Sequence, residues 1–205
     1  MPSYLHKLML MHQNGEKHAS TTRLAEYINL DTIIVRKDFE LTGISGQPGV
    51  GYKTDELIEG IRRYLNWDRI CRACLVGAGS LGSALIGHEE FAEYGLEITH
   101  VFDSNPDRID SIIHGHRVSD VRKMSEALKD NPPDLGIICV PSNCAQMVTD
   151  ELIACGVKAF WNFANVCLRV PQDVIVQREV IAGGFAMLSV KMAKRNSRQN
   201  DFLED

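Results

Sequence analysis

Three glycines in the segment CLVGAGSLGSALI, residues 74–86, have the spacing of a phosphate-binding turn. The apolar run before Gly77 is typical of a buried strand, and the apolar pattern after Gly82 is typical of a helix. Gly77 would permit a tight turn, Gly79 would let the backbone approach a pyrophosphate, and Gly82 would let helix and strand pack closely. The N–H groups at the helix start would face the phosphates. The pattern therefore predicts a dinucleotide-binding turn.

An aspartate follows this turn at the distance that a dinucleotide site requires. Asp103 closes the apolar segment LEITHVFD, roughly 20 residues after Gly82. Its carboxylate can accept hydrogen bonds from the hydroxyls of an adenosine ribose, and it would repel a 2′-phosphate. The sequence therefore predicts NAD(H) rather than NADP(H). The alternative is a glycine-rich turn with a surface aspartate, which the strand and helix around the motif disfavour.

Groups that could catalyse a reaction are few beyond this motif. A dehydrogenase needs an acid or base beside the nicotinamide and a substrate pocket, usually on a further domain. Only about a hundred residues follow Asp103, and the predicted fold uses nearly all of them. The histidines of this half are single or lie in a loop: His88, His100, His114 and His116. We expect no catalytic residue, no enzyme activity, and a nicotinamide that is sensed rather than consumed.

Alternating strands and helices must position the turn and the aspartate. Strands are predicted at residues 70–76, 96–103, 135–140, 158–162 and 174–180. Helices are predicted at residues 80–86, from Asn105-Pro106 onward, and at 120–129, 143–155 and 182–194. Because the strands are apolar throughout, they indicate a parallel sheet covered on both faces.

The first 66 residues have a different, helical pattern. Helices are predicted at residues 3–12, 21–27, 32–41 and 54–65, with inward positions that include Leu5, Leu8, Met9, His12, Leu24, Ala25 and Ile28. In the third helix, Ile33, Ile34 and Phe39 are expected to pack while Arg36 and Lys37 point outward. The short turn between the second and third helices is typical of a helix-turn-helix. The glycine-rich segment TGISGQPGVGY, residues 42–52, indicates a hairpin wing.

Composition limits the class of protein. The chain has 205 residues, 44% hydrophobic content and a net charge of -5, which are ordinary values for a globular protein and argue against a broad nucleic-acid coating. No apolar run approaches the ~20 residues that cross a bilayer, so we expect a cytoplasmic protein with no membrane contact. The six cysteines show no disulfide or metal-ligand pattern, and Cys71 and Cys74 are expected to be packed thiols rather than a zinc or redox site.

A family resemblance joins the two halves of the sequence. The segments VRKDF, GVGY, LVGAGSLGSAL, FDSNP, CVPSNCAQ and NFANVCLRVP are similar, in this order and nearly at the same spacings, to segments of the Rex redox-sensing transcriptional repressors. The resemblance runs nearly end to end. It implies a winged helix-turn-helix domain that binds operator DNA, an α/β Rossmann-like parallel-sheet domain that binds NAD(H), and a C-terminal helix swapped between the subunits of a homodimer.

The resemblance also implies domains and site residues. The domains would be residues 1–66 for DNA, 67–181 for the dinucleotide, and 182–205 for dimerisation. Arg36 and Lys37 would face the major groove, and NADH would release the dimer from DNA. The cofactor-binding residues of this chain would be Gly77, Ala78, Gly79, Ser80, Leu81, Gly82, Asp103, Pro141, Asn162 and Phe163. A terminal helix with Phe185, Leu188 and Met192 on one stripe fits the swap, with packing on its own subunit as the alternative.

The chain departs from the family at several positions. Its wing lacks the usual basic residue before GVGY, and residues 1–65 contain eight Lys or Arg against eight Asp or Glu. His6, His88 and Val180 stand where well-studied members have Arg, Tyr and Asp. Two other functions therefore remain open at this stage: a divergent NAD(H)-binding regulator that does not bind DNA, and a small NAD-dependent oxidoreductase.

Overall fold

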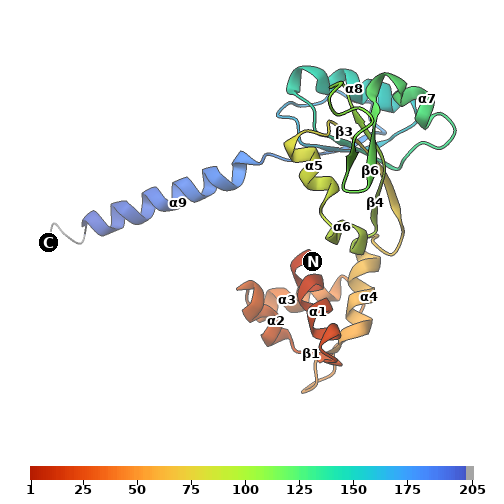
Figure 1. The fold of residues 1–205 in the computed structure, drawn as a ribbon. Helices are drawn as coiled ribbons and strands as arrows, with labels where there is room; N and C mark the ends of the chain where they lie inside the picture. The colour runs from red at the N-terminus through yellow and green to blue at the C-terminus, as the bar shows by residue number, and fades with distance from the viewer. Residues whose placement is uncertain (202–205) are drawn as a thin grey trace. The chain divides into compact units, whose positions relative to one another are not determined.

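The computed structural model describes the backbone of residues 1–201 and the burial of the side chains of residues 1–195. These residues form two compact units (Figure 1). The first comprises Met1–Cys71 together with Glu90–Leu96, and the second comprises Arg72–Glu89 and the chain from Glu97 onward. The domain boundaries expected at residues 66 and 181, which place residues 90–96 in the dinucleotide domain, remain predictions. The last four residues of the expected dimerisation segment lie outside the described residues.

The first unit consists of helices and one small sheet. Its elements are α1 (Pro2–Gln13), β1 (His18–Ala19), α2 (Thr21–Ile28), α3 (Thr32–Glu40), β2 (Tyr52–Lys53), α4 (Thr54–Tyr64) and, from the later segment, α6 (Glu90–Glu93). The Ser20 side chain caps α2 by accepting the N–H of Arg23, and Asp31 caps α3 by accepting the N–H of Ile33. The four helices predicted in residues 1–66 are therefore confirmed.

The glycine-rich segment between α3 and α4 forms the expected tight hairpin. Gln47 and Gly51 exchange two backbone hydrogen bonds, of 2.7 and 2.9 Å. Gly49 has a φ of 75°, which glycine adopts at little cost after a proline in such a turn. The chain then enters β2, which pairs antiparallel with β1.

The core of the first unit fixes the orientation of α3. Its buried side chains include Tyr4, Leu5, Leu8 and Met11 from α1, and Val35 and Phe39 from α3. The Tyr4 hydroxyl donates a 2.6 Å hydrogen bond to Asp38 of α3, and its ring meets Phe39 edge-on at 5.1 Å. Burial, followed by the hydrogen bond to Asp38, raises the pKa of Tyr4 well above its usual value.

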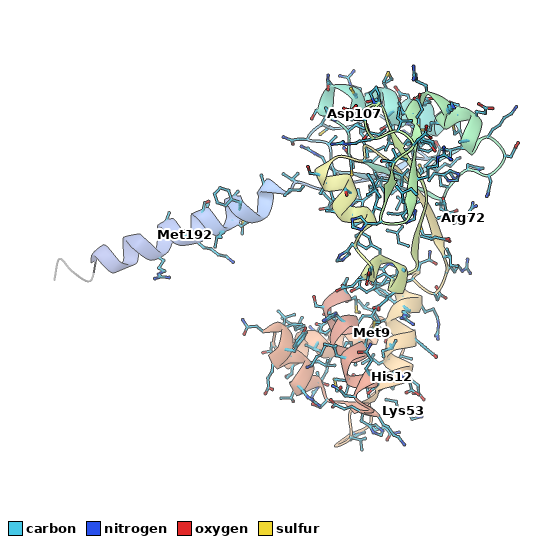
Figure 2. The ribbon with its side chains drawn as sticks, in the orientation of Figure 1. Met9, His12, Lys53, Arg72, Asp107 and Met192 are labelled. Carbon is cyan, nitrogen blue, oxygen red and sulfur yellow. The ribbon has the colours of Figure 1, made fainter. Side chains whose placement is uncertain are left out.

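Three packing predictions for this unit were wrong. Ile33 is 60% exposed and Ile34 is 46% exposed, because Val35 and Phe39 occupy the inward face of α3. Arg36 and Lys37 point outward as predicted. His12 near the end of α1, labelled in Figure 2, is also exposed, since Met11 rather than His12 fills the inward position.

The second unit is built on a seven-stranded sheet. Its strands are β3 (Cys71–Val76), β4 (Leu96–Asp103), β5 (Ile112–Ile113), β6 (His116–Asp120), β7 (Leu135–Ile138), β8 (Ala159–Asn162) and β9 (Ile175–Arg178). The strand order is β5-β6-β4-β3-β7-β8-β9. Strands β4 and β6 pair in parallel, as do β3 with β7, β7 with β8, and β8 with β9. Because β4 and β7 flank β3 on opposite sides, the order reverses beside β3, where ligands bind in such sheets.

Helices cover both faces of this sheet. They are α5 (Ser80–Ile86), η1 (Val121–Lys123), α7 (Met124–Leu128) and α8 (Ser142–Ala154). Helices α7 and α8 contribute Met124, Leu128 and Leu152 to a core with Cys74 and Phe160. Gly82 of α5 lies against Leu75, which points away from that core. The predicted doubly wound α/β fold is confirmed.

The predicted helix at Asn105-Pro106 is wrong. Residues 106–110 form turns: the Asn105 side chain accepts the N–H of Asp107 as a helix cap does, but Asp110 has a φ of 67° and its N–H donates to Val118, so the chain leaves the helical path after one turn. The chain then makes the short antiparallel pair β5 and β6, which the sequence did not reveal. Both strands are short, and β6 contains the polar residues His116, Arg117, Ser119 and Asp120.

Helix α9 (Ala182–Asp201) ends the described chain and is longer than predicted. Phe185, Met187, Leu188, Val190 and Met192 are each 53–72% exposed. Met192 is labelled on this helix in Figure 2. None of the helices in the described part of the chain has the length and apolar character to span a membrane.

Replacing Tyr4 by Phe should lower the free energy of unfolding of the first unit by about 1–2 kcal/mol, because Asp38 loses its donor. Tyr64→Phe, at an exposed position, is the matched control. Both variants are made with Trp161→Phe, so that Trp67 is the one remaining tryptophan. Urea unfolding followed by Trp67 fluorescence measures the difference, and equal stability of the two variants would contradict the role of Tyr4.

Candidate functional site

The geometry of the glycine turn requires glycine at two of its three glycine positions. Gly77 follows β3 with a φ of 100°, and a Cβ there would lie 2.6 Å from the carbonyl oxygen of Cys139. A Cβ on Gly82 would overlap the carbonyl oxygen of Gly77. Gly79 is the N-cap of α5, and a Cβ there would meet only the guanidinium of Arg108. Gly77 and Gly82 thus fold the turn, while Gly79 opens it to the cleft.

Asp103 lies at the end of β4 and is bound to the same turn. Its carboxylate accepts the backbone N–H of Ala78 at 2.8 Å through one oxygen and the N–H of Asn105 at 2.8 Å through the other. The guanidinium of Arg108 lies 3.4 Å from the first of these oxygens. The side chain is nearly buried but lines a cavity. A carboxylate has about four acceptor positions, and Ala78, Asn105 and Arg108 use three of them, so one remains for a ribose hydroxyl.

The cavity has a volume of about 850 Å³, which is in the range of a small-molecule site. It lies at the strand ends around β3, where the sheet order reverses. Its lining residues come from the glycine turn, from the ends of β4 and β7, and from η1 and α8: Val76, Gly77, Gly79, Asp103, Ser104, Arg108, Val121, Arg122, Cys139, Val140, Pro141, Cys144, Met147, Val148 and Glu151. The walls are mostly apolar, with charged groups at few positions.

The structure places the predicted cofactor residues in two groups. Gly77, Gly79, Asp103 and Pro141 line the cavity, while Ala78, Ser80, Leu81 and Gly82 form the turn and first part of α5 beside it. Asn162 is fully buried, and its amide is used within its own loop, donating to the carbonyl of Val166 and accepting the N–H of Ala164. Phe163 packs against Trp161 at 4.9 Å. Neither Asn162 nor Phe163 lines the cavity.

Sequence reasoning missed several lining residues. Arg108 comes from the turn at a predicted helix start, and Arg122 comes from the short 3-10 helix η1 after its Asp120 cap, so no helical period in the sequence directs either side chain to the cleft. Cys144 and Met147 sit one turn apart on the face of α8 toward the cleft. The spacing of 144, 147, 148 and 151 is that of one helical face, which was the available signal.

The groups that line the cleft are poorly suited to acid–base chemistry. Within the part of the chain that the structure describes, no histidine lines the cavity, and no cluster of His, Cys, Asp and Glu could hold a metal ion. Burial raises the pKa of the Cys139 thiol to about 12, so it is protonated at neutral pH. The Cys74 thiol is fully buried with a pKa raised to about 12 for the same reason, and all six cysteines are free.

The three residues that differ from the family pattern lie on different elements of the structure. His6 is exposed on α1, His88 is exposed just after α5, and Val180 is half exposed before α9. Next to His88 in the chain, a Cβ on Gly87 would meet the ring of His114, so this imidazole packs on the end of α5.

Comparisons with known proteins now identify the family. Residues 68–166 match a family model described as a CoA binding domain. The redox-sensing transcriptional repressor Rex of Treponema denticola is 40% identical over 192 residues, covering 94% of this chain and 91% of that protein. Rex of Clostridium beijerinckii is 40% identical over 177 residues, covering 86% of this chain and 84% of that protein.

The chain belongs to the Rex family of redox-sensing transcriptional repressors. Solved structures agree with this assignment. RSP, a Rex-family repressor, in complex with NAD⁺ and operator DNA has a TM-score of 0.84 and 30% identity, covering 97% of this chain and 92% of that one. Its complex with NADH also has a TM-score of 0.84, with 28% identity over 97% and 93% of the two chains. The Rex-like fold predicted from the sequence is confirmed.

Substituting Gly82 by Ala should lower the free energy of unfolding of the second unit by about 1–3 kcal/mol, because the new methyl group would press on the Gly77 carbonyl. Ser83→Ala, one residue later on α5, adds no such contact and serves as the control. Urea unfolding is followed by Trp161 fluorescence in a Trp67→Phe background. A Gly82 variant as stable as the Ser83 variant would show that the turn has room for a side chain.

Proposed function

We propose that this protein is a redox-sensing repressor that binds operator DNA through its first unit and NAD(H) in the cleft of its second unit. The observation that carries the proposal is the joint presence, in one chain, of an Asp103-bound glycine turn and a capped helix α3 that exposes Arg36 and Lys37. The family membership and the RSP complexes with NAD⁺, NADH and operator DNA support it.

In the cleft, the pyrophosphate would lie over Gly79 and the first N–H groups of α5, with Ala78, Ser80 and Leu81 forming the rest of the turn. The first N–H groups of a helix have no partner within the helix and suit an anion. The adenosine ribose would bond to Asp103. A 2′-phosphate would meet this carboxylate, so NAD(H) is favoured over NADP(H).

The nicotinamide would extend past Pro141 toward the loop that contains Asn162 and Phe163. Asn162 would act there by holding the loop through its internal hydrogen bonds. The oxidised nicotinamide is cationic and the reduced form is neutral, so a mostly apolar site should bind NADH more tightly. Only this difference in affinity can shift the protein between two states, with NADH favouring the DNA-free one.

A regulator rather than an enzyme fits the chemistry of the cleft. The lining side chains that the structure describes include no histidine, and the Cys139 thiol is protonated. The family members matched in sequence are repressors. The repressor relatives therefore favour a regulator over the oxidoreductase, while the DNA-free regulator is supported by the equal numbers of acidic and basic residues in positions 1–65.

Binding measurements test the proposed function directly. NADH should bind at least about tenfold more tightly than NAD⁺, and saturating NADH should weaken DNA binding by about tenfold or more. DNA is a duplex enriched from a random-sequence pool by the protein itself, and its binding is measured by fluorescence anisotropy without nucleotide, with NAD⁺ and with NADH. Asp103→Ala should weaken NADH binding by about tenfold or more, because a charge-assisted hydrogen bond is lost.

Asp173→Ala is the matched control, because Asp173 is exposed and pairs only with Lys158 at the surface. Equal affinity for NADH and NAD⁺ would leave redox sensing without a driving force. Nucleotide binding without enrichment of any duplex would favour the regulator that does not bind DNA.

We further propose that α9 is swapped between the subunits of a homodimer. Its exposed apolar side chains lie on more than one face of the helix, which suits burial on several sides by a partner. Leu188→Asp should raise the dimer dissociation constant by a factor of about 100 or more, because a charge would enter an apolar interface. Sedimentation velocity measures the change, and Lys194→Asp is the control. A dimer unaffected by Leu188→Asp would place the interface elsewhere.

A further inference from the structure

The outward face of α3 carries two adjacent isoleucines. Ile33 and Ile34 are the second and third residues of the helix, and they are 60% and 46% exposed. Ile33 lies one turn before Lys37, on the side of the helix opposite to the buried pair Val35 and Phe39. A single exposed apolar residue is ordinary. Two neighbouring isoleucines in the first turn of a helix, beside two cations, need an explanation.

Rotation of α3 cannot bury these side chains. Val35 and Phe39 are both 0% exposed in the core of the first unit. The hydrogen bond from Tyr4 to Asp38 and the edge-on contact of Tyr4 with Phe39 hold the helix from the α1 side. The Asp31 cap fixes where the helix starts. Ile33 and Ile34 are therefore presented outward by the fold itself.

The cations on the same helix indicate the chemistry of the occupant. Arg36 and Lys37 are exposed, and neither makes an ion pair with another described residue, whereas Arg23 is paired with Glu16 and Lys53 with Glu56. A polyanion that also presents apolar groups would contact both the cations and the isoleucines of this helix face. The major groove of DNA does so, because phosphates line it and each thymine presents a 5-methyl group there.

We propose that Ile33 and Ile34 are specificity-determining residues that contact thymine 5-methyl groups in the major groove. The first turn of a recognition helix is the part that approaches base edges, and apolar side chains discriminate thymine by its methyl group. Arg36 and Lys37 bind phosphates or bases beside them. The operator half-site of this protein therefore contains thymines opposite the first turn of α3. This inference rests on the proposed DNA-binding function.

Removal of single methyl groups from DNA tests the contact. A duplex enriched from a random-sequence pool by the wild-type protein is resynthesised with one thymine replaced by deoxyuridine at a time. Wild-type affinity should fall about fourfold at one or two positions, the effect expected for losing one buried methyl group. In Ile33→Ala or Ile34→Ala the sensitivity at the matching position should disappear, while sensitivity at the other position is kept.

Two controls separate this effect from a general loss of binding. Lys37→Ala should weaken binding to every duplex and reduce the dependence on salt, but it should keep the methyl sensitivity. Ile70→Ala removes an equally exposed isoleucine of the first unit away from α3 and should change neither property. Circular dichroism of each variant checks that the helices form, which is expected because the altered side chains are exposed.

The outcomes distinguish this inference from the proposed function. Duplex binding without any methyl sensitivity that depends on residue 33 or 34 overturns the inference and leaves the repressor function in place. Failure to enrich any duplex, with or without nucleotide, overturns both. If Ile33→Ala instead lowers self-association in sedimentation velocity, the face is an interface between copies of the chain, and the assignment to DNA is wrong.

Discussion

The carbonyl oxygen of Gly77 leaves no room for a side chain on Gly82, and this contact sets how the chain leaves β3 and enters α5. The left-handed conformation of Gly77 brings the turn against the end of β7, and the Asp103 carboxylate holds Ala78 from the end of β4. Three strands are thereby tied together where the sheet order reverses. The cavity exists because these backbone contacts hold the turn against the ends of β4 and β7 and leave Gly79 facing the cavity.

The same dependence on a few fixed contacts governs the first unit. With acidic and basic residues equal in number over positions 1–65, long-range attraction contributes little to binding DNA there. What the unit offers instead is a helix whose rotation is fixed by a buried tyrosine, a capping aspartate and an aromatic contact. The fixed orientation of α3 takes the place of an excess of positive charge. DNA binding by this surface should therefore depend more on the base sequence than on the salt concentration.

Much of this fold could be predicted because its signals are local. The glycine spacing, the strand that ends at Asp103, and the caps Ser20 and Asp31 each follow from the chemistry of adjacent residues. The failures arose where tertiary packing chooses between equal patterns. Isoleucines at 33 and 34 match a helical core stripe as well as Val35 and Phe39 do, and the packing of the whole core, which includes Tyr4 and Tyr52 against Phe39, decides between them. Asn105-Pro106 begins a helical turn, but Asp110 adopts a left-handed conformation and bonds to Val118, which ends the turn. Arg108 lines the cleft from a turn and Arg122 from the short η1, and no period in the sequence marks either side chain as a lining residue.

Residues 90–96, although they lie between β3 and β4 in the chain, pack with the first unit, where Tyr94 stacks on Trp67 at 4.7 Å. The polypeptide consequently passes from one unit to the other three times rather than once. The two units therefore cannot be exchanged at a single junction. A chimaera with a foreign N-terminal domain would leave the Tyr94 ring exposed to water, unless residues 90–96 were replaced together with that domain.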